Sequence, residues 1–368
     1  MKSPVDPGDL TAEWLTDTLR AAGALARARI TAMDIDLLGK EKGLASQIAR
    51  IHLSYDVEER AAPRSLVAKF SSPDPDLRAV IHAMGFYERE TCFYERLAQQ
   101  SPIRTPRCYF SMLDPASGAS LLLLEDLGSV HNGSWIRGCS LTEAELAIGG
   151  IAGLHARWWQ QPQLKEMGWL ELRGLVSVQQ APSVFRQTWQ PFLQKVGPGV
   201  PEEVLRAGAW LNAHLGRLSE YLYQEAPLTI IHNDYQADNL FFLPSGPSLS
   251  LVVADWQLVT RGRAVLDVAC FLGGNLDPAT RRDHELRLLR AYHSSLIDNG
   301  VGDYAFEQCW RDYRLGMFQE ISRLVSVVGV GAVPNELERA YCDVLIPRYC
   351  QAVRDLSTAD SACSEEAR

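Results

Sequence analysis

The sequence lacks the features of several protein classes. None of its apolar runs approaches the length that crosses a membrane, and its first residues, MKSPVDPGDL, lack the apolar core of a signal peptide. Its eight cysteines form no C-x-x-C pair, so neither a zinc site nor a disulfide framework is indicated. Positive charge is scarce, because 36 Lys and Arg stand against 45 Asp and Glu, for a net charge of −9. We therefore expect a cytoplasmic protein with reduced thiols, which binds neither membrane nor nucleic acid.

The length and the apolar content predict two lobes. At 368 residues the chain exceeds the size at which one hydrophobic core stops growing. Apolar residues make up 46% of it, enough to fill a core in each lobe. The sequence contains no internal repeat and no low-complexity tract.

The most informative stretch is residues 230–257, IIHNDYQADNLFFLPSGPSLSLVVADWQ. Two short apolar runs on either side of PSGPS predict a β-hairpin, which would bring Asn239 close to Asp255. Together with Asp234 these residues offer carboxylate and amide oxygens, which suit Mg²⁺, and a carboxylate able to take a proton from a hydroxyl. The alternative is that each of these side chains only caps a turn.

The order H-N-D-x-x-x-x-N, followed by D-W-Q, resembles the catalytic segment of kinase-like phosphotransferases. This superfamily includes aminoglycoside phosphotransferases, choline kinases and ecdysteroid kinase-like enzymes, whose loop usually reads H-G-D; here Asn233 replaces the glycine. The resemblance implies that Asp234 is the catalytic base and that Asn239 and Asp255 bind Mg²⁺. It also implies an α+β, protein kinase-like fold of two lobes, with an antiparallel sheet and a helix in the N-terminal lobe and a mainly helical C-terminal lobe.

The first part of the chain fits the N-terminal lobe of such a fold. Hydrophobic spacing predicts a helix over residues 9–25, strands over 30–39, 46–57, 64–70, 107–113 and 119–128, and one helix over 79–100. Lys69 lies in an otherwise apolar strand, where the resemblance implies a contact with the α- and β-phosphates of ATP. The resemblance selects Glu90 as its partner, with Glu88 and Glu95 as competitors. A lysine that faces solvent is the alternative.

Four further residues are expected to contact the nucleotide. Gly43 and Ser46 belong to a glycine-containing loop that could place backbone N–H groups over phosphates. The alternative is an ordinary hairpin loop, which would have the same sequence pattern. Glu125 and Asp126 end a strand where the related families have the hinge that binds adenine. We accordingly expect an N-terminal lobe over residues 1–127, a C-terminal lobe over 128–356 and a disordered tail over 357–368.

The C-terminal lobe is expected to be helical. A capping box at Ser140–Glu143 opens one helix, Asp277 and Pro278 open another that ends at Asn299–Gly300, and further helices are predicted over 178–196, 202–225, 303–328 and 335–355. The D-V-A triplet at Asp267 resembles the D-L-A of the same superfamily, and this resemblance implies that the Asp267 carboxylate supports the catalytic loop. We interpret His155 as a core histidine. A structural role is also the favoured interpretation for residues that could face an acceptor: Trp256, Gln257, Asp277, Trp310, Tyr313 and Glu320.

Three functions are compatible with these motifs. The leading hypothesis is a small-molecule kinase that moves the γ-phosphate of ATP, with Mg²⁺, to a hydroxyl of an aminoglycoside, choline-like alcohol, steroid or other small molecule. A catalytically silent nucleotide-binding protein is the second. A protein kinase is the third, and the short route from Asp255 to Asp267 disfavours it because it leaves little room for an activation loop.

Overall fold

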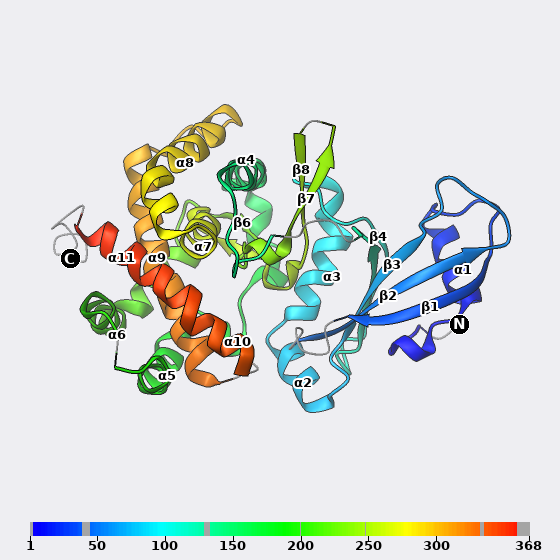
Figure 1. Ribbon diagram of the computed structural model, residues 1–368, viewed down its shortest axis with the longest axis horizontal. Helices are drawn as coiled ribbons and strands as arrows, with labels where there is room; N and C mark the ends of the chain where they lie inside the picture. Colours follow the sequence, from blue (N-terminus) through cyan, green and yellow to red (C-terminus); the bar gives the residue numbers. More distant parts are fainter. Residues whose placement is uncertain are drawn as a thin grey trace. The chain divides into compact units, whose positions relative to one another are not determined.

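The computed structural model describes residues 3–38, 45–128, 133–198, 200–246, 248–331 and 335–358 (Figure 1). The chain divides into two compact units. Unit 1 comprises Met1–Gln100, Thr105–Val130 and Asp255–Gln257, and unit 2 comprises Ser101–Arg104, His131–Ala254 and Leu258–Arg368. The domain boundaries expected at residues 127 and 356 remain predictions. Gly43 and most of the expected tail lie outside the described residues.

Unit 1 is built on a five-stranded antiparallel sheet in the order β1-β2-β3-β5-β4. Its strands are β1 (Ile30–Leu38), β2 (Ser46–Tyr55), β3 (Ser65–Ser71), β4 (Cys108–Leu113) and β5 (Ser120–Glu125). The strands predicted for the N-terminal lobe are confirmed.

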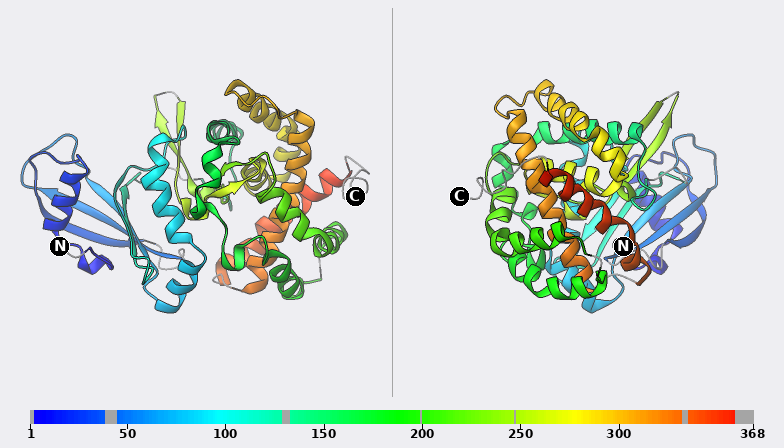
Figure 2. Two further views of the ribbon diagram at one scale, coloured as in Figure 1. Left: turned by 180° about the vertical axis from the view of Figure 1, so that it is seen from behind. Right: turned by 60° about the vertical axis from the view of Figure 1, so that its left-hand side comes forward.

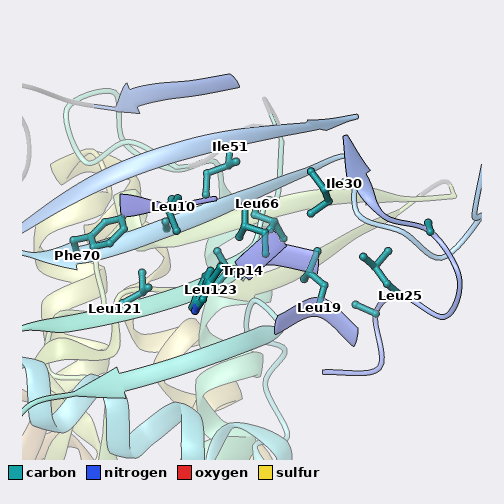
Figure 3. Packing of buried hydrophobic residues seen from close by; sticks show 14 residues of the cluster. Leu10, Trp14, Leu19, Leu25, Ile30, Ile51, Leu66, Phe70, Leu121 and Leu123 are labelled. Atoms are coloured by element: carbon teal, nitrogen blue, oxygen red, sulfur yellow. The ribbon is translucent and has the colours of Figure 1, made fainter. Parts of the chain in front are cut away.

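Helix α1 (Ala12–Ala21) packs on one face of this sheet (Figure 3). The Thr11 hydroxyl accepts a hydrogen bond from a backbone N–H of the first turn and so caps the helix. Alternation along β3 turns Leu66 and Phe70 into the apolar cluster that α1 covers, where both are buried. The same alternation turns Lys69 toward the opposite face of the sheet.

The segment 79–100, predicted as one helix, forms two. Helix α2 (Pro75–Ala83) ends before Gly85, and α3 (Phe86–Arg96) begins after it. Gly85 has a φ of 77°, in the left-handed region, which cannot continue a right-handed helix and which glycine adopts at the least cost. The prediction of a single helix is therefore wrong, and Gly85 sets the direction of α3 separately from that of α2.

Unit 2 is mainly helical, as predicted. Its helices are α4 (Leu141–Trp158), α5 (Ala181–Val196), α6 (Glu202–Tyr223), α7 (Val265–Asn275), α8 (Pro278–Asp298), α9 (Phe306–Val330), α10 (Asn335–Ala340) and α11 (Ile346–Thr358). Helix α9 packs against α5, α6, α7, α8 and α11 (Figure 2). The helix predicted over 335–355 is divided by a π-helical turn at Tyr341–Leu345.

The predicted starts of two helices are confirmed. Ser140 and Glu143 cap α4 reciprocally, and the Asp277 carboxylate accepts backbone N–H bonds at the start of α8. Among the described residues, no helix is both long and apolar enough to cross a membrane.

Two small sheets complete unit 2. Strand β6 (Thr229–Ile231) pairs with β9 (Thr260–Gly262), and β7 (Leu240–Ser245) pairs with β8 (Ser248–Val253) as the predicted hairpin. The polar loop between β6 and β7 contains His232 to Asn239. An antiparallel sheet with helices in one unit and a helical second unit confirm the predicted α+β class.

Candidate active site

Lys69 lies between two carboxylates in unit 1. Its Nζ is 2.9 Å from Glu90 Oε1, 2.8 Å from Glu90 Oε2 and 2.7 Å from Asp255 Oδ1. Strand β3, helix α3 and the segment after β8 each supply one member of this cluster. Lys69 and Glu90 are buried, and a buried charge is tolerated only when it is paired, as it is here.

The two carboxylates of this cluster stabilise the charged form of Lys69. Burial disfavours the charged form of Lys69, but the carboxylates of Asp255 and Glu90 outweigh burial and raise the pKa of the Lys69 ammonium. Burial also raises the pKa of the Glu90 carboxyl, and Lys69 opposes that rise. Lys69 is therefore a fixed cation at neutral pH, suited to an anionic ligand such as phosphate.

The segment Asp255–Gln257 is anchored on α3. The Trp256 ring is fully buried and stacks on Phe93, with ring centroids 3.8 Å apart and planes at 7°. Arg89 Nε donates to the Gln257 carbonyl at 3.1 Å. Asp255 has a φ of 63°, which residues other than glycine seldom adopt. The two anchors hold Asp255 in this conformation and so direct its carboxylate.

Side chains of α7 accept hydrogen bonds from the backbone of the loop between β6 and β7. The Asp267 carboxylate accepts the N–H groups of His232 and Asn233, each at 2.7 Å. Farther along the loop, the Asn275 side chain accepts the N–H of Ala237 at 2.8 Å. The predicted support of this loop by Asp267 is confirmed.

The backbone at Asn233 has a conformation that glycine favours. Its φ is 63°, in the left-handed region, where glycine is favoured and asparagine is among the better tolerated side chains. The Tyr223 hydroxyl at the end of α6 donates to Asn233 Oδ1 at 3.2 Å. Asn233 thus adopts the conformation that glycine favours, and its side chain adds a hydrogen bond with Tyr223.

The carboxylate of Asp234 is fixed by its neighbours in the loop. Gln236 Nε2 donates to Asp234 Oδ1 at 2.9 Å, and Asn239 Nδ2 donates to Asp234 Oδ2 at 3.2 Å. Asn239 Nδ2 also donates to the Asp234 carbonyl at 2.9 Å, so the amide oxygen of Asn239 points away from Asp234. The N–H of Ala254, the residue before Asp255, donates to the Asn239 carbonyl at 3.0 Å.

Arg323, which the sequence analysis did not single out, approaches Asp234 from α9. Its Nη1 donates to Glu320 Oε1 at 3.2 Å, and its Nη2 is 3.9 Å from Asp234 Oδ1. Burial raises the pKa of the Glu320 carboxyl, and Arg323 opposes the rise. Burial and the charge of Asp234 raise the pKa of the Tyr341 phenol, and Arg323 opposes the rise.

His155 has a contact that the sequence analysis missed. The ring is fully buried on α4, with Nδ1 2.8 Å from the Tyr292 hydroxyl and Nε2 3.1 Å from Asp267 Oδ2. The same Asp267 oxygen accepts the N–H of His232. His155 therefore helps to orient the carboxylate that holds the loop.

The carboxylates of the expected hinge bond within unit 1. Asp126 accepts hydrogen bonds from Arg50 Nη2 at 3.1 Å and Ser65 Oγ at 2.6 Å. Burial disfavours the ionised form, but these bonds outweigh it and lower the pKa of Asp126. Glu125 Oε2 accepts the N–H of Arg107 at 3.1 Å. Contact of Glu125 and Asp126 with adenine remains a prediction, as does contact of Gly43 and Ser46 with phosphate.

Three of the six residues considered for acceptor binding have structural roles. Trp256 fills the core of unit 1, and Asp277 caps α8. Tyr313 is fully buried and donates to Glu285 Oε1 at 2.5 Å. Glu320 differs, because it holds Arg323 beside Asp234.

The side chains present suit Mg²⁺ bound together with a nucleotide. Within the described ranges, no three His, Cys, Asp or Glu side chains gather into a site that could hold a metal alone. Mg²⁺ needs only one or two protein oxygens when phosphates and water complete its octahedron. The amide oxygen of Asn239 and the carboxylate of Asp255 are donors of the right kind.

Comparison with known families identifies the chain. The model of a family described as ecdysteroid kinase-like matches residues 40–300, a range that includes Lys69 and all of 230–257. The chain belongs to the ecdysteroid kinase-like family. The kinase-like phosphotransferase superfamily predicted from the sequence is confirmed. A comparison of this ecdysteroid kinase-like protein with curated proteins gave no match.

Solved structures of small-molecule kinases share its fold. A Ralstonia eutropha protein assigned as an aminoglycoside phosphotransferase has 16% identity and a TM-score of 0.57, over 95% of this chain and 98% of that one. Choline kinase of Cryptosporidium parvum has 9% identity and a TM-score of 0.53, over 95% of each chain. The GDP and kanamycin complex of an aminoglycoside phosphotransferase has 11% identity and a TM-score of 0.53, over 95% and 100%. The predicted kinase-like fold is confirmed.

Proposed function

We propose that this protein transfers the γ-phosphoryl group of ATP to a hydroxyl of a small molecule. The observation that carries the proposal is the Lys69 ammonium held between Glu90 and Asp255, residues brought to β3 from separate parts of the chain. A buried cation that already has two carboxylates is fixed in place, as a phosphate-binding group must be. The solved GDP complex of a protein with this fold supports nucleotide binding.

Each residue has a defined task in this reaction. Asp234 orients the acceptor hydroxyl and takes its proton, because Gln236 and Asn239 fix both of its oxygens. Lys69 binds the α- and β-phosphates, and the oxygens of Asn239 and Asp255 hold Mg²⁺. When bound, ATP and Mg²⁺ supply the phosphoryl group and neutralise its charge. The chain contributes mainly position and charge, because the transition state is loose.

Two alternatives fit less well. A silent nucleotide-binding protein would not need Asp234, yet Asp267, Gln236 and Asn239 all serve to position that residue or its loop. A protein kinase needs an activation loop after Asp255, but β9 ends at Gly262 and α7 already begins at Val265.

The test compares two aspartate variants. Asp234→Ala should keep its affinity for ATP and lose about 10²- to 10⁴-fold in turnover, because a positioned general base contributes that much. ADP release would be measured with Mg²⁺ and a panel of hydroxylated acceptors that includes choline and kanamycin. Asp283→Asn, an exposed change on α8, is the matched control and should behave as the wild type. Undiminished turnover by Asp234→Ala would refute the role of Asp234.

A further inference from the structure

The neighbourhood of Asp234 in unit 2 contains a guanidinium that the proposed reaction has not used. Glu320 and Arg323 lie about one turn apart on α9, and Glu320 Oε1 accepts from Arg323 Nη1 at 3.2 Å. The Glu320 side chain is only 6% exposed, whereas that of Arg323 is 25% exposed. Arg323 is therefore anchored at one nitrogen and accessible to a ligand.

The gap between Arg323 and Asp234 can admit the oxygen of an acceptor hydroxyl. Arg323 Nη2 is 3.9 Å from Asp234 Oδ1, too far for a hydrogen bond between them. An acceptor hydroxyl that donates to Asp234 Oδ1 at about 2.7 Å can lie within hydrogen-bond reach of Nη2 as well. A substituent on the next carbon of the acceptor would then also face the guanidinium.

A guanidinium donates hydrogen bonds and accepts none. A hydroxyl, carbonyl, ether or carboxylate oxygen next to the reacting hydroxyl would satisfy it, and an ammonium group there would be repelled. Glu320 cannot remove this preference, because its carboxylate is turned to Nη1. In this proposal the carboxylate of Asp234 is committed to the reacting hydroxyl.

We propose that Arg323 binds the phosphate acceptor beside its reacting hydroxyl and selects acceptors with a neighbouring oxygen function over those with a neighbouring ammonium group. This inference rests on the proposed kinase function. It assigns acceptor discrimination to α9, outside the catalytic loop.

The experiment measures KM and kcat for two sets of probes. Glycerol, glyceraldehyde and glycerate carry an oxygen beside a hydroxyl, and choline and ethanolamine carry a nitrogen. The wild type should prefer the oxygen set by about tenfold or more in kcat/KM, the value of one hydrogen bond to a charged group. Arg323→Gln should raise KM for the oxygen set by about tenfold and leave KM for ATP unchanged. The ratio of kcat/KM between the oxygen set and the nitrogen set should therefore fall. Arg323→Lys keeps the positive charge and should retain part of the preference for the oxygen set.

Two controls keep the outcomes separate. Arg311→Gln removes an exposed guanidinium more than three turns earlier on the same helix and should change neither KM. The shift in melting temperature caused by an inert ATP analogue shows that each variant is folded. Preference for the amino alcohols, or an unchanged acceptor KM in folded Arg323→Gln, would overturn the role of Arg323 and leave the kinase function standing. No ADP release by the wild type with any acceptor would instead overturn the kinase function and the inference together.

Discussion

At the scale of single residues, the segment 230–257 contains two non-glycine residues in the left-handed region. Asn233 and Asp255 both have a φ of 63°, and each flanks or forms part of the proposed site. Such conformations cost of order 1–3 kcal/mol and persist where the surroundings impose them. Asp267 holds the conformation of Asn233 by accepting its backbone N–H. The stacking of Trp256 on Phe93 holds that of Asp255.

Substitution of Asn233 tests this backbone requirement. Asn233→Ala and Asn233→Gly both lose the hydrogen bond from Tyr223, so the difference between them reports the backbone alone. Asn233→Ala should be less stable than Asn233→Gly by about 1–2 kcal/mol, the cost of a left-handed conformation for a residue with a Cβ. Urea unfolding measures the difference. Equal stability of the two variants would show that the loop relaxes away from this conformation.

The contacts found only in the structure, those of Arg323 and His155, share a physical reason for escaping prediction. Arg323 and His155 lie on amphipathic helices where their spacing matches ordinary surface and core positions, and both are distant in sequence from the loop they serve. Asp234, Asn239 and Asp255 stood out because their spacing within one short stretch matches a known motif. Local motifs can be predicted from a sequence, whereas contacts made by helix packing cannot.

At the scale of elements, helix packing in unit 2 depends on glycines without space for a side chain. A Cβ added at Gly329 on α9 would lie 2.4 Å from the Thr188 carbonyl oxygen of α5, and backbone cannot yield as a side chain can. A Cβ added at Gly149 on α4 would meet nothing within 4 Å. The two glycines therefore form a matched pair with opposite expected effects.

Alanine substitution at these glycines tests the packing of α5 on α9. Gly329→Ala should lower the free energy of unfolding by about 1–3 kcal/mol, the usual cost of overpacking. Gly149→Ala should raise it by up to about 1 kcal/mol, because alanine favours the helix. Thermal or urea unfolding distinguishes them. A stable Gly329→Ala variant would mean that α5 and α9 are less closely packed than described.

The elements themselves were largely predictable. Caps at Ser140 and Asp277 and the PSGPS turn are local signals, and the structure confirms the helices and the hairpin that they predict. The break at Gly85 was missed because apolar residues continue across it at helical spacing, and only the positive φ interrupts the helix. The π-helical turn at Tyr341 likewise leaves no mark in the apolar pattern.

At the scale of the whole molecule, the proposed function predicts that nucleotide stabilises the fold. A ligand present at 100 times its Kd adds about 2.7 kcal/mol to the stability of the state that binds it. An inert ATP analogue with Mg²⁺ should therefore raise the melting temperature, and EDTA should reduce the rise. Lys69→Met should abolish the rise relative to the variant's own melting temperature, whereas Lys165→Met, an exposed change, should preserve it. A full rise in Lys69→Met would contradict phosphate binding by Lys69.

Unit 1 is built from three segments of the chain, and the last of them, Asp255–Gln257, affects how that unit can fold. Only after more than two-thirds of the polypeptide has been synthesised does Trp256 become able to cover Phe93, and Asp255 to meet Lys69. A fragment that stopped at the end of β5 would expose an aromatic surface and leave the ammonium with Glu90 alone. The first-made part of the protein is thus completed by a three-residue segment from the last third of the chain, and cutting the chain at any single point cannot yield both units whole.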